Sequence, residues 1–242
     1  TAKSGLIPAQ ENFWNSWAVL RNDIKLIVCG SATSWMINNL IRNRGGLHNR
    51  LTHHLIVKPF TLHECEEYFK AYHFGYSRKQ IAECYMVMGG IPYYLSMMDK
   101  SKSLAQNIDQ LFFADNAELK DEFNDLYRAL FKKSADHIAV VTALATKGMG
   151  MTRQELVKAS GGKDNGAFST VLEELEQCGF IRLYEPFNTA NKMTSDIRQK
   201  RNTLFQLVDF YTLFYFRFIK HNKYQNSSFW SSSQNSQLYH TW

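Results

Sequence analysis

The chain has 242 residues, 45% of them hydrophobic and 21% charged, and its net charge is +6. This composition is typical of a folded protein with one large or two ordinary domains, and it excludes an intrinsically disordered chain. No apolar run approaches the roughly 20 residues that span a bilayer, and the first residues lack the charged and then apolar pattern of a secretory signal. We therefore expect a cytoplasmic protein that does not enter a membrane.

The four cysteines, Cys29, Cys65, Cys84 and Cys178, are scattered and form no C-x-x-C pair. This spacing argues against a zinc site and against a disulfide framework. A reducing, intracellular setting follows, and a secreted protein with a disulfide is the alternative.

The positive charge is concentrated late in the chain. Between Lys192 and Lys223 there are seven basic and two acidic residues, a local excess of +5. Such an excess can mark a surface for nucleic acid. A solvated loop and helix face would explain the same charges, so both interpretations stand.

The first 60 residues have the pattern of a small α/β unit. Apolar residues at helical spacing predict a helix over 9–22. The short apolar run 26–29, closed by a glycine, predicts a buried strand of a parallel sheet. A short helix near 35–41 and a second strand over 53–57, ended by Pro59, complete the unit.

From Thr61 the pattern becomes helical. Thr61 with Glu64, and Ser77 with Gln80, have the spacing of capping boxes, so each pair predicts the start of a helix. A Gly-Gly pair then ends the second helix, and a proline suits the first turn of the next. Because helices this short are not stable alone, we expect them to pack as a bundle. Further helices are predicted over 104–112, 117–132 and 136–145.

A winged helix is predicted after the glycine-rich break at 147–150. Thr152 with Glu155 caps a short helix, and a turn and the strongly patterned helix 167–177 follow. A strand over 180–185, a polar loop over 188–202 and a returning strand over 204–208 complete the motif. Helix, turn, helix, strand, polar wing and strand is the order of a winged helix.

Aromatic residues crowd the end of the chain. They predict packing against a further domain or, as the alternative, an exposed interaction face. In either case we expect an exposed apolar patch and some self-association. The serine-rich stretch 227–236 is predicted to be a loop. The aromatic residues concerned are Phe205, Phe210, Tyr211, Phe214, Tyr215, Phe216 and Phe218.

The residues alone contain no complete active site. There is no G-x-x-x-x-G-K-[ST] phosphate loop and no apolar strand that ends in paired acids. No histidine pair has metal-ligand spacing, and no G-x-S-x-G nucleophile elbow occurs.

Three features could still contribute to a ligand site. Ser31 follows the predicted strand at the sheet edge where open α/β folds bind ligands, although the position alone favours a serine that caps a helix. Arg44 and Arg50 lie in a basic segment that could bind phosphate or be simply solvated. The segment 89–92 could hold a backbone close to a planar ligand, or only separate two helices.

In combination these motifs resemble a family. The chain is similar to prokaryotic AAA+/STAND-type P-loop ATPases of the archaeal type, which carry a winged helix and a C-terminal nuclease-like domain. The resemblance covers nearly the whole chain, and four motifs in order are fairly specific. They are 26–50 (LIVCGSATSWMINNLIRNRGGLHNR), 57–65 (VKPFTLHEC), 89–95 (GGIPYYL) and 204–210 (LFQLVDF).

The resemblance implies a fold class that is mainly α with a partial α/β P-loop core. Residues 1–60 would be the C-terminal part of that core and 61–146 a helical lid. Residues 147–208 would be the winged helix, and 209–242 the start of a nuclease-like region. The family's phosphate loop and acidic strand would lie upstream of Thr1.

The resemblance also implies roles for single residues. Ser31 would be the polar sensor near the γ-phosphate. Arg50, with Arg44 as second choice, would act as an arginine finger on a neighbouring nucleotide. Gly90 and Pro92 match the family's G-x-P motif near adenine. ATP and Mg²⁺ would bind the intact protein, and we expect neither to bind this chain tightly.

Three functions follow as hypotheses. The first is an ATP-dependent switch that acts on the winged helix. The second is a winged helix that binds DNA, with Arg198, Lys200 and Arg201 on phosphates, although three glutamates at 173, 174 and 176 on the expected recognition helix suit protein contact equally well. The third is an interaction or scaffold role, within a homo-oligomer or against a partner domain of the same protein.

Overall fold

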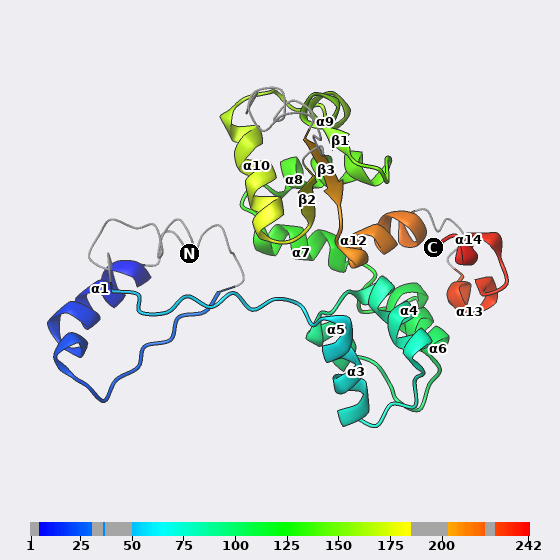
Figure 1. Ribbon diagram of the computed structural model, residues 1–242, viewed down its shortest axis with the longest axis horizontal. Helices are drawn as coiled ribbons and strands as arrows, with labels where there is room; N and C mark the ends of the chain where they lie inside the picture. Colours follow the sequence, from blue (N-terminus) through cyan, green and yellow to red (C-terminus); the bar gives the residue numbers. More distant parts are fainter. Residues whose placement is uncertain (1–4, 31–35, 37–49, 185–202, 221–225) are drawn as a thin grey trace, which may run out of the picture.

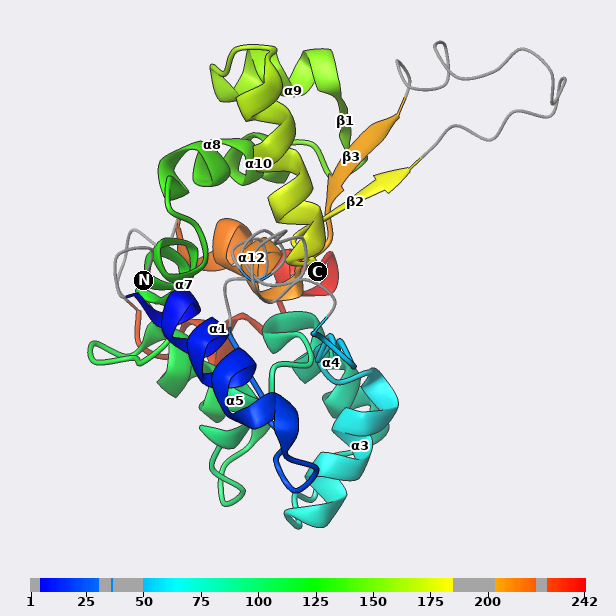
Figure 2. The ribbon, with the colours of Figure 1, turned by 90° about the vertical axis from the view of Figure 1, so that its left-hand side faces the viewer.

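The computed structural model describes residues 5–30, 36, 50–184, 203–220 and 226–242. This part of the chain is mainly helical and contains one small antiparallel sheet of three strands. The expectation of a mainly α protein is therefore confirmed. Figures 1 and 2 show a sheet-bearing unit at one end and a helical bundle at the other, with α7 and α12 between them.

The N-terminal part consists of a helix and two extended segments. Helix α1 spans Leu6–Ser16, and the 3₁₀ helix η1 spans Ala18–Leu20. No residue of α1 is buried, and α1 lies apart from the bundle in Figure 1. Segments 21–30 and 50–60 run between α1 and the bundle. Within the predicted helix at 35–41 only Met36 is described, and it is helical.

The prediction of two strands in this part is wrong. Neither 26–29 nor 53–57 forms a strand, and Ile27, Leu55 and Val57 are 87%, 85% and 93% exposed. A strand requires a neighbour that pairs with its backbone, and no described residue pairs with either segment. Their apolar sequence is therefore extended and exposed rather than buried.

The helical bundle begins where the capping boxes predict. Thr61 and Ser77 start α3 (Leu62–Ala71) and α4 (Arg78–Met88), and each makes both hydrogen bonds of its box. Gly89 ends α4 with φ 61°, and Pro92 opens α5 (Pro92–Ser96). The helix predicted over 104–112 is α6 (Leu104–Ile108), continued by the π-helix η3 (Asp109–Phe113).

Two further helices connect the bundle to the sheet. They are α7 (Glu122–Leu130), which starts five residues later than the prediction of 117, and α8 (Ser134–Ala145). A continuous cluster of buried side chains extends from Cys65 in α3 through both helices to the end of the described chain.

The sheet unit contains the two helices and two strands in the predicted order, and it adds a short first strand that the sequence did not predict. Strand β1 (Met151–Thr152) leads into α9 (Arg153–Ser160) and α10 (Gly166–Gln177), and β2 (Ile181–Tyr184) and β3 (Leu204–Leu207) follow. The strand order is β1-β3-β2, and all pairs are antiparallel. The predicted polar loop 188–202 lies outside the described residues.

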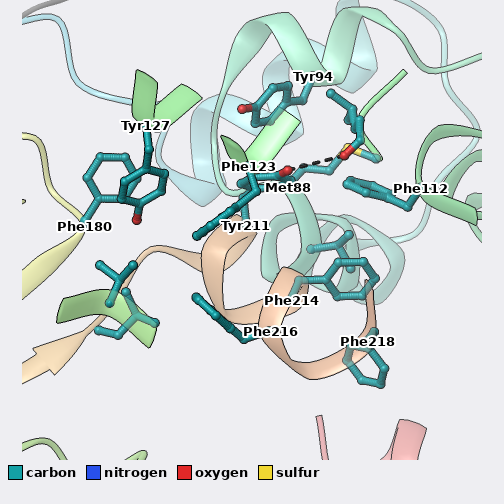
Figure 3. Close-up of a cluster of buried hydrophobic side chains, with 14 of the residues drawn as sticks. Met88, Tyr94, Phe112, Phe123, Tyr127, Phe180, Tyr211, Phe214, Phe216 and Phe218 are labelled. Carbon is teal, nitrogen blue, oxygen red and sulfur yellow. Dashed lines mark hydrogen bonds between the residues drawn. The ribbon is translucent and has the colours of Figure 1, made fainter. Parts of the chain in front are cut away.

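The structure also corrects the prediction for the aromatic end of the chain. It forms α12 (Phe210–Phe214), the π-helix η4 (Tyr215–Ile219), α13 (Phe229–Ser233) and α14 (Gln237–His240), so 227–236 is not simply a loop. Tyr211, Phe214, Phe216 and Phe218 are buried within this chain (Figure 3). Their aromatic partners come from α5, α7, η3 and α13, so residues of this chain cover them. Among the described helices, none is both long and apolar enough to cross a membrane.

Candidate functional site

The structure describes only three of the eight residues that the sequence singled out. Ser31 and Arg44 lie outside the described residues, and so do the three basic residues of the wing, Arg198, Lys200 and Arg201. Arg50 is exposed in a turn that leads into the extended segment 50–60. Gly90 and Pro92 lie together at the junction of α4 and α5.

Gly90 is in close contact with another stretch of backbone. The amide of Phe60 donates a hydrogen bond to the Gly90 carbonyl at 2.7 Å. A Cβ atom on Gly90 would lie 1.8 Å from the Phe60 carbonyl oxygen, far inside any non-bonded distance. The close approach expected for this glycine is therefore present, but the main chain of Phe60 occupies the space rather than a planar ligand.

Pro92 marks the outward side of α5. Pro92 and Tyr93 are exposed, whereas Tyr94 and Leu95 face the core. Nearby in the fold, the ring of Tyr68 lies 6.1 Å from that of Phe60 and 4.5 Å from that of Tyr72. The edge of the bundle around Gly90 thus presents aromatic surface and backbone. Of the groups expected to bind phosphate, Ser31 and Arg44 lie outside the described residues, and Arg50 is exposed.

A group of buried tyrosines joins the bundle to the helices beyond it. The Tyr94 hydroxyl donates to the Glu122 carboxylate of α7 at 2.9 Å, and the Tyr211 hydroxyl of α12 donates to the Leu119 carbonyl at 3.4 Å. Burial raises the pKa of Tyr94 and of Tyr211, and the nearby Glu122 carboxylate raises both further. Both rings therefore stay neutral and act as fixed donors.

Asp209 lies at the point where β3 ends and α12 begins. Its carboxylate accepts the amide of Thr212 at 2.8 Å and so caps α12. The residue as a whole is half-buried, but its carboxyl group is enclosed, and this burial raises the pKa of Asp209 against the opposing effect of the Thr212 bond. The Thr212 hydroxyl lies 3.4 Å from the Tyr127 hydroxyl of α7. Sequence reasoning missed this cap, although an aspartate before an apolar run is a recognisable start signal.

A histidine of α8 forms a hydrogen bond with one of the three glutamates of α10. His137 Nε2 lies 2.8 Å from Glu174 Oε2, and Nδ1 lies 3.0 Å from the Lys133 carbonyl oxygen. The imidazole stacks on Phe131 with 3.9 Å between ring centres, and its side chain is 3% exposed. No sequence pattern joins positions 37 apart, so this pair could not be predicted. The other two glutamates, at 173 and 176, remain exposed.

The described residues do not assemble a metal centre. They contain no group of three or more His, Cys, Asp or Glu side chains that could hold a metal ion. No disulfide joins the four cysteines in the part of the chain that the structure describes, and Cys65 and Cys84 are buried in the bundle. Magnesium takes oxygen ligands, mainly carboxylates and phosphates. The described part of the chain offers no fitting donor set, so no chemical step is derived through Mg²⁺.

Comparison with known proteins identifies no relative. No family model matches the chain, and neither a curated protein nor a solved structure matches it. Any statement of function therefore rests on the motifs and on the geometry described above.

Proposed function

We propose that this chain is the sensor, lid and winged-helix part of an ATP-dependent switch of the AAA+/STAND type. In this proposal the intact protein holds nucleotide and Mg²⁺ between an α/β core and the lid. The nucleotide state then biases the winged helix between two arrangements. The chain alone has no phosphate loop and is expected to bind nucleotide weakly or not at all.

The observation that carries the proposal is the pair of exposed apolar segments. Segments 21–30 and 50–60 are extended, and Ile27, Leu55 and Val57 in them are almost fully exposed. Apolar extended segments of this kind are typical of strands that are covered on both faces in a parallel sheet. In the intact protein, neighbouring strands of the P-loop core would pair with them and bury them.

The contact between Phe60 and Gly90 supports the lid assignment. This contact fastens the end of segment 50–60 to the α4–α5 junction through one backbone hydrogen bond. A movement of the core segment would therefore be transmitted to the helical bundle at this point. The motif residues Gly90 and Pro92 would act as the mechanical joint of the lid, with adenine near the exposed side of α5.

The sheet unit supports the winged-helix assignment. In a winged helix two helices precede a hairpin, and a short strand before them completes the sheet. Here β1 precedes α9 and α10, and β3 lies between β1 and β2. Within the described residues, the order of α9, α10, β2 and β3 supports the motif that the sequence predicts.

The arginine-finger role is tested by Arg50→Ala in the intact protein. Turnover should fall while ATP affinity stays near normal, because a finger stabilises charge in the transition state rather than in bound ATP. Lys100→Ala, at another exposed cation, is the matched control and should leave turnover unchanged. Equal turnover in wild type and Arg50→Ala would eliminate the finger role.

The class of the protein is tested by the coding sequence upstream of Thr1. A glycine-rich loop that ends in Lys and Ser or Thr, followed by an apolar strand that ends in acids, would support the ATPase. Absence of both would reduce the chain to a binding module.

A winged helix that binds another molecule without ATP hydrolysis is the second candidate function. The exposed carboxylates of Glu173 and Glu176 on α10 favour a protein surface over DNA phosphates. A salt titration with duplex DNA separates the two partners. Contact between a basic wing and phosphates gives an affinity that falls steeply with salt. No binding at low salt would leave protein contact.

A further inference from the structure

Two π-helical segments, 102 residues apart at their closest, take part in one small region of the fold. They are η3 (Asp109–Phe113) and η4 (Tyr215–Ile219). The rings of Phe113 in η3 and Phe218 in η4 both pack on Phe229 of α13, at 5.0 Å and 6.4 Å. π-helical turns are rare and are frequent at functional positions. Their convergence on one short helix raises the question of what that helix does.

The first residue of η3 binds the backbone of α13 directly. The Asp109 carboxylate accepts the amides of Trp230 at 2.7 Å and of Ser231 at 3.0 Å. Asp109 is only 7% exposed, so these bonds form away from bulk water. Hydrogen bonds to an ionised carboxylate are stronger than neutral ones. Asp109 therefore fastens α13 to the bundle across 121 residues of sequence.

Trp230 is enclosed by aromatic rings. It is 3% exposed and contacts Phe214 at 5.1 Å and Phe218 at 5.0 Å, both nearly edge-on. Tyr239 of α14 covers it from another side at 5.1 Å. Phe214 and Phe218 form part of the buried cluster in Figure 3. We refer to Asp109, Phe113, Phe214 and Phe218 as the socket, and to residues 226–242 as the strap.

The strap crosses the joint between the bundle and the helix that leaves the sheet. Helix α13 packs on α6 and η3, and burial together with the nearby Glu83 carboxylate of α4 raises the pKa of Tyr239. Helix α12 packs on the same α4 and continues directly into η4. A docked strap thus holds η4 and α12 against the bundle. Since α12 follows β3, the strap also limits how far the sheet unit can move.

The strap has little stability of its own. Helices α13 and α14 have five and four residues, too short to persist without docking. The indole nitrogen of Trp242 is buried and has no hydrogen-bond partner among the described residues, which opposes docking. Undocking would therefore unfold 226–242 locally and leave the rest of the bundle folded.

We propose that the socket is a docking site whose built-in occupant is the strap, and that local undocking of the strap releases α12 and η4 from the bundle. The proposal follows from these contacts and does not depend on the ATPase assignment. The strap works as a latch between the sheet unit and the bundle.

The first test uses Asp109→Asn in the full chain and measures amide hydrogen exchange by mass spectrometry. Loss of the carboxylate should speed exchange in 229–242 by about tenfold or more, with faster exchange also in 210–219. Exchange in α9 and α10 should not change. Asp125→Asn, at an exposed carboxylate paired with Arg128, is the matched control. Unchanged exchange in 229–242, or equal acceleration throughout the chain, would overturn the proposal.

The second test uses Trp230→Ala, which weakens docking of the strap and leaves the socket residues unchanged. A labelled peptide of residues 226–242 is titrated against full-length wild type, Trp230→Ala, and Trp230→Ala with Asp109→Asn. The peptide should bind Trp230→Ala at least about tenfold more tightly than wild type, whose own strap competes, and the added Asp109→Asn change should reverse this gain. Equal binding to all three chains, or no binding to Trp230→Ala, would refute the socket.

Discussion

Gly90→Ala should destabilise the protein, because the new methyl group would collide with the backbone of Phe60. The Cβ would lie 1.8 Å from the Phe60 carbonyl oxygen and 2.8 Å from the Phe60 nitrogen. Rotamer changes cannot relieve such a contact, so segment 50–60 must separate from α4. The separation breaks the hydrogen bond from Phe60 to Gly90 and leaves polar groups unpaired, at about 1–3 kcal/mol. With the cost of overpacking, we expect a loss of about 3 kcal/mol.

Two other glycines serve as controls for this prediction. Gly89 has φ 61° and ψ −160°, a backbone conformation that is essentially restricted to glycine, and open space around its Cβ position, so Gly89→Ala should cost only backbone strain of about 1–3 kcal/mol. Gly148 has open space and no such φ, and Gly148→Ala should change stability by less than about 0.5 kcal/mol. Urea unfolding of the three variants measures these differences. If Gly90→Ala costs no more than Gly148→Ala, the role assigned to the Phe60 contact is wrong.

Two further predictions concern polar contacts between side chains. A double-mutant cycle with His137→Gln and Glu174→Gln should give a coupling of about 0.5–3 kcal/mol in urea unfolding, because the pair is largely buried, whereas Glu173→Gln should be nearly neutral. A coupling near zero would mean that the contact between His137 and Glu174 does not contribute to the free energy of unfolding. The hydrogen bond from Lys147, together with the Thr152 amide, lowers the pKa of Glu155 to about 2. Since this folded pKa lies below the unfolded value of about 4.5, the stabilisation is present above that value and is lost as pH falls towards 2. Glu155→Gln should remove this part of the acid sensitivity in a pH series of thermal melts, and an unchanged profile would contradict the assignment.

Local signals in the sequence predicted the bundle well. Thr61 and Ser77 begin helices through hydrogen bonds that span three residues, so the pattern alone contains the cause. Gly89 and Pro92 end and restart helices by their own backbone preferences. The order of elements in the sheet unit was predictable for the same reason.

Features that depend on distant partners could not be predicted. The apolar run 26–29 has the composition of a buried strand, but a strand forms only beside another strand, and no described residue supplies one. The stretch 227–236 is rich in serine and reads as a loop, yet α13 forms there because Asp109 caps it from 121 residues away. Propensity is a weak guide where one tertiary contact decides the outcome.

The candidate site was predictable only in part. The spacing of Gly89, Gly90 and Pro92 indicated a close approach at this junction, and the structure contains one. The identity of the approaching group, the main chain of Phe60, could not be read from the pattern. Two side-chain contacts, Tyr94 with Glu122 and His137 with Glu174, join residues on different helices. The spacing of these residues in the sequence does not predict either contact.

The enclosure of Trp230 has an optical consequence. An indole surrounded by Phe214, Phe218 and Tyr239 emits at short wavelength, and its emission shifts to the red when water reaches it. Trp17, by contrast, is half exposed and should emit at long wavelength throughout. With the other tryptophans replaced by phenylalanine, the colour of Trp230 emission would report in real time whether the chain is closed on itself.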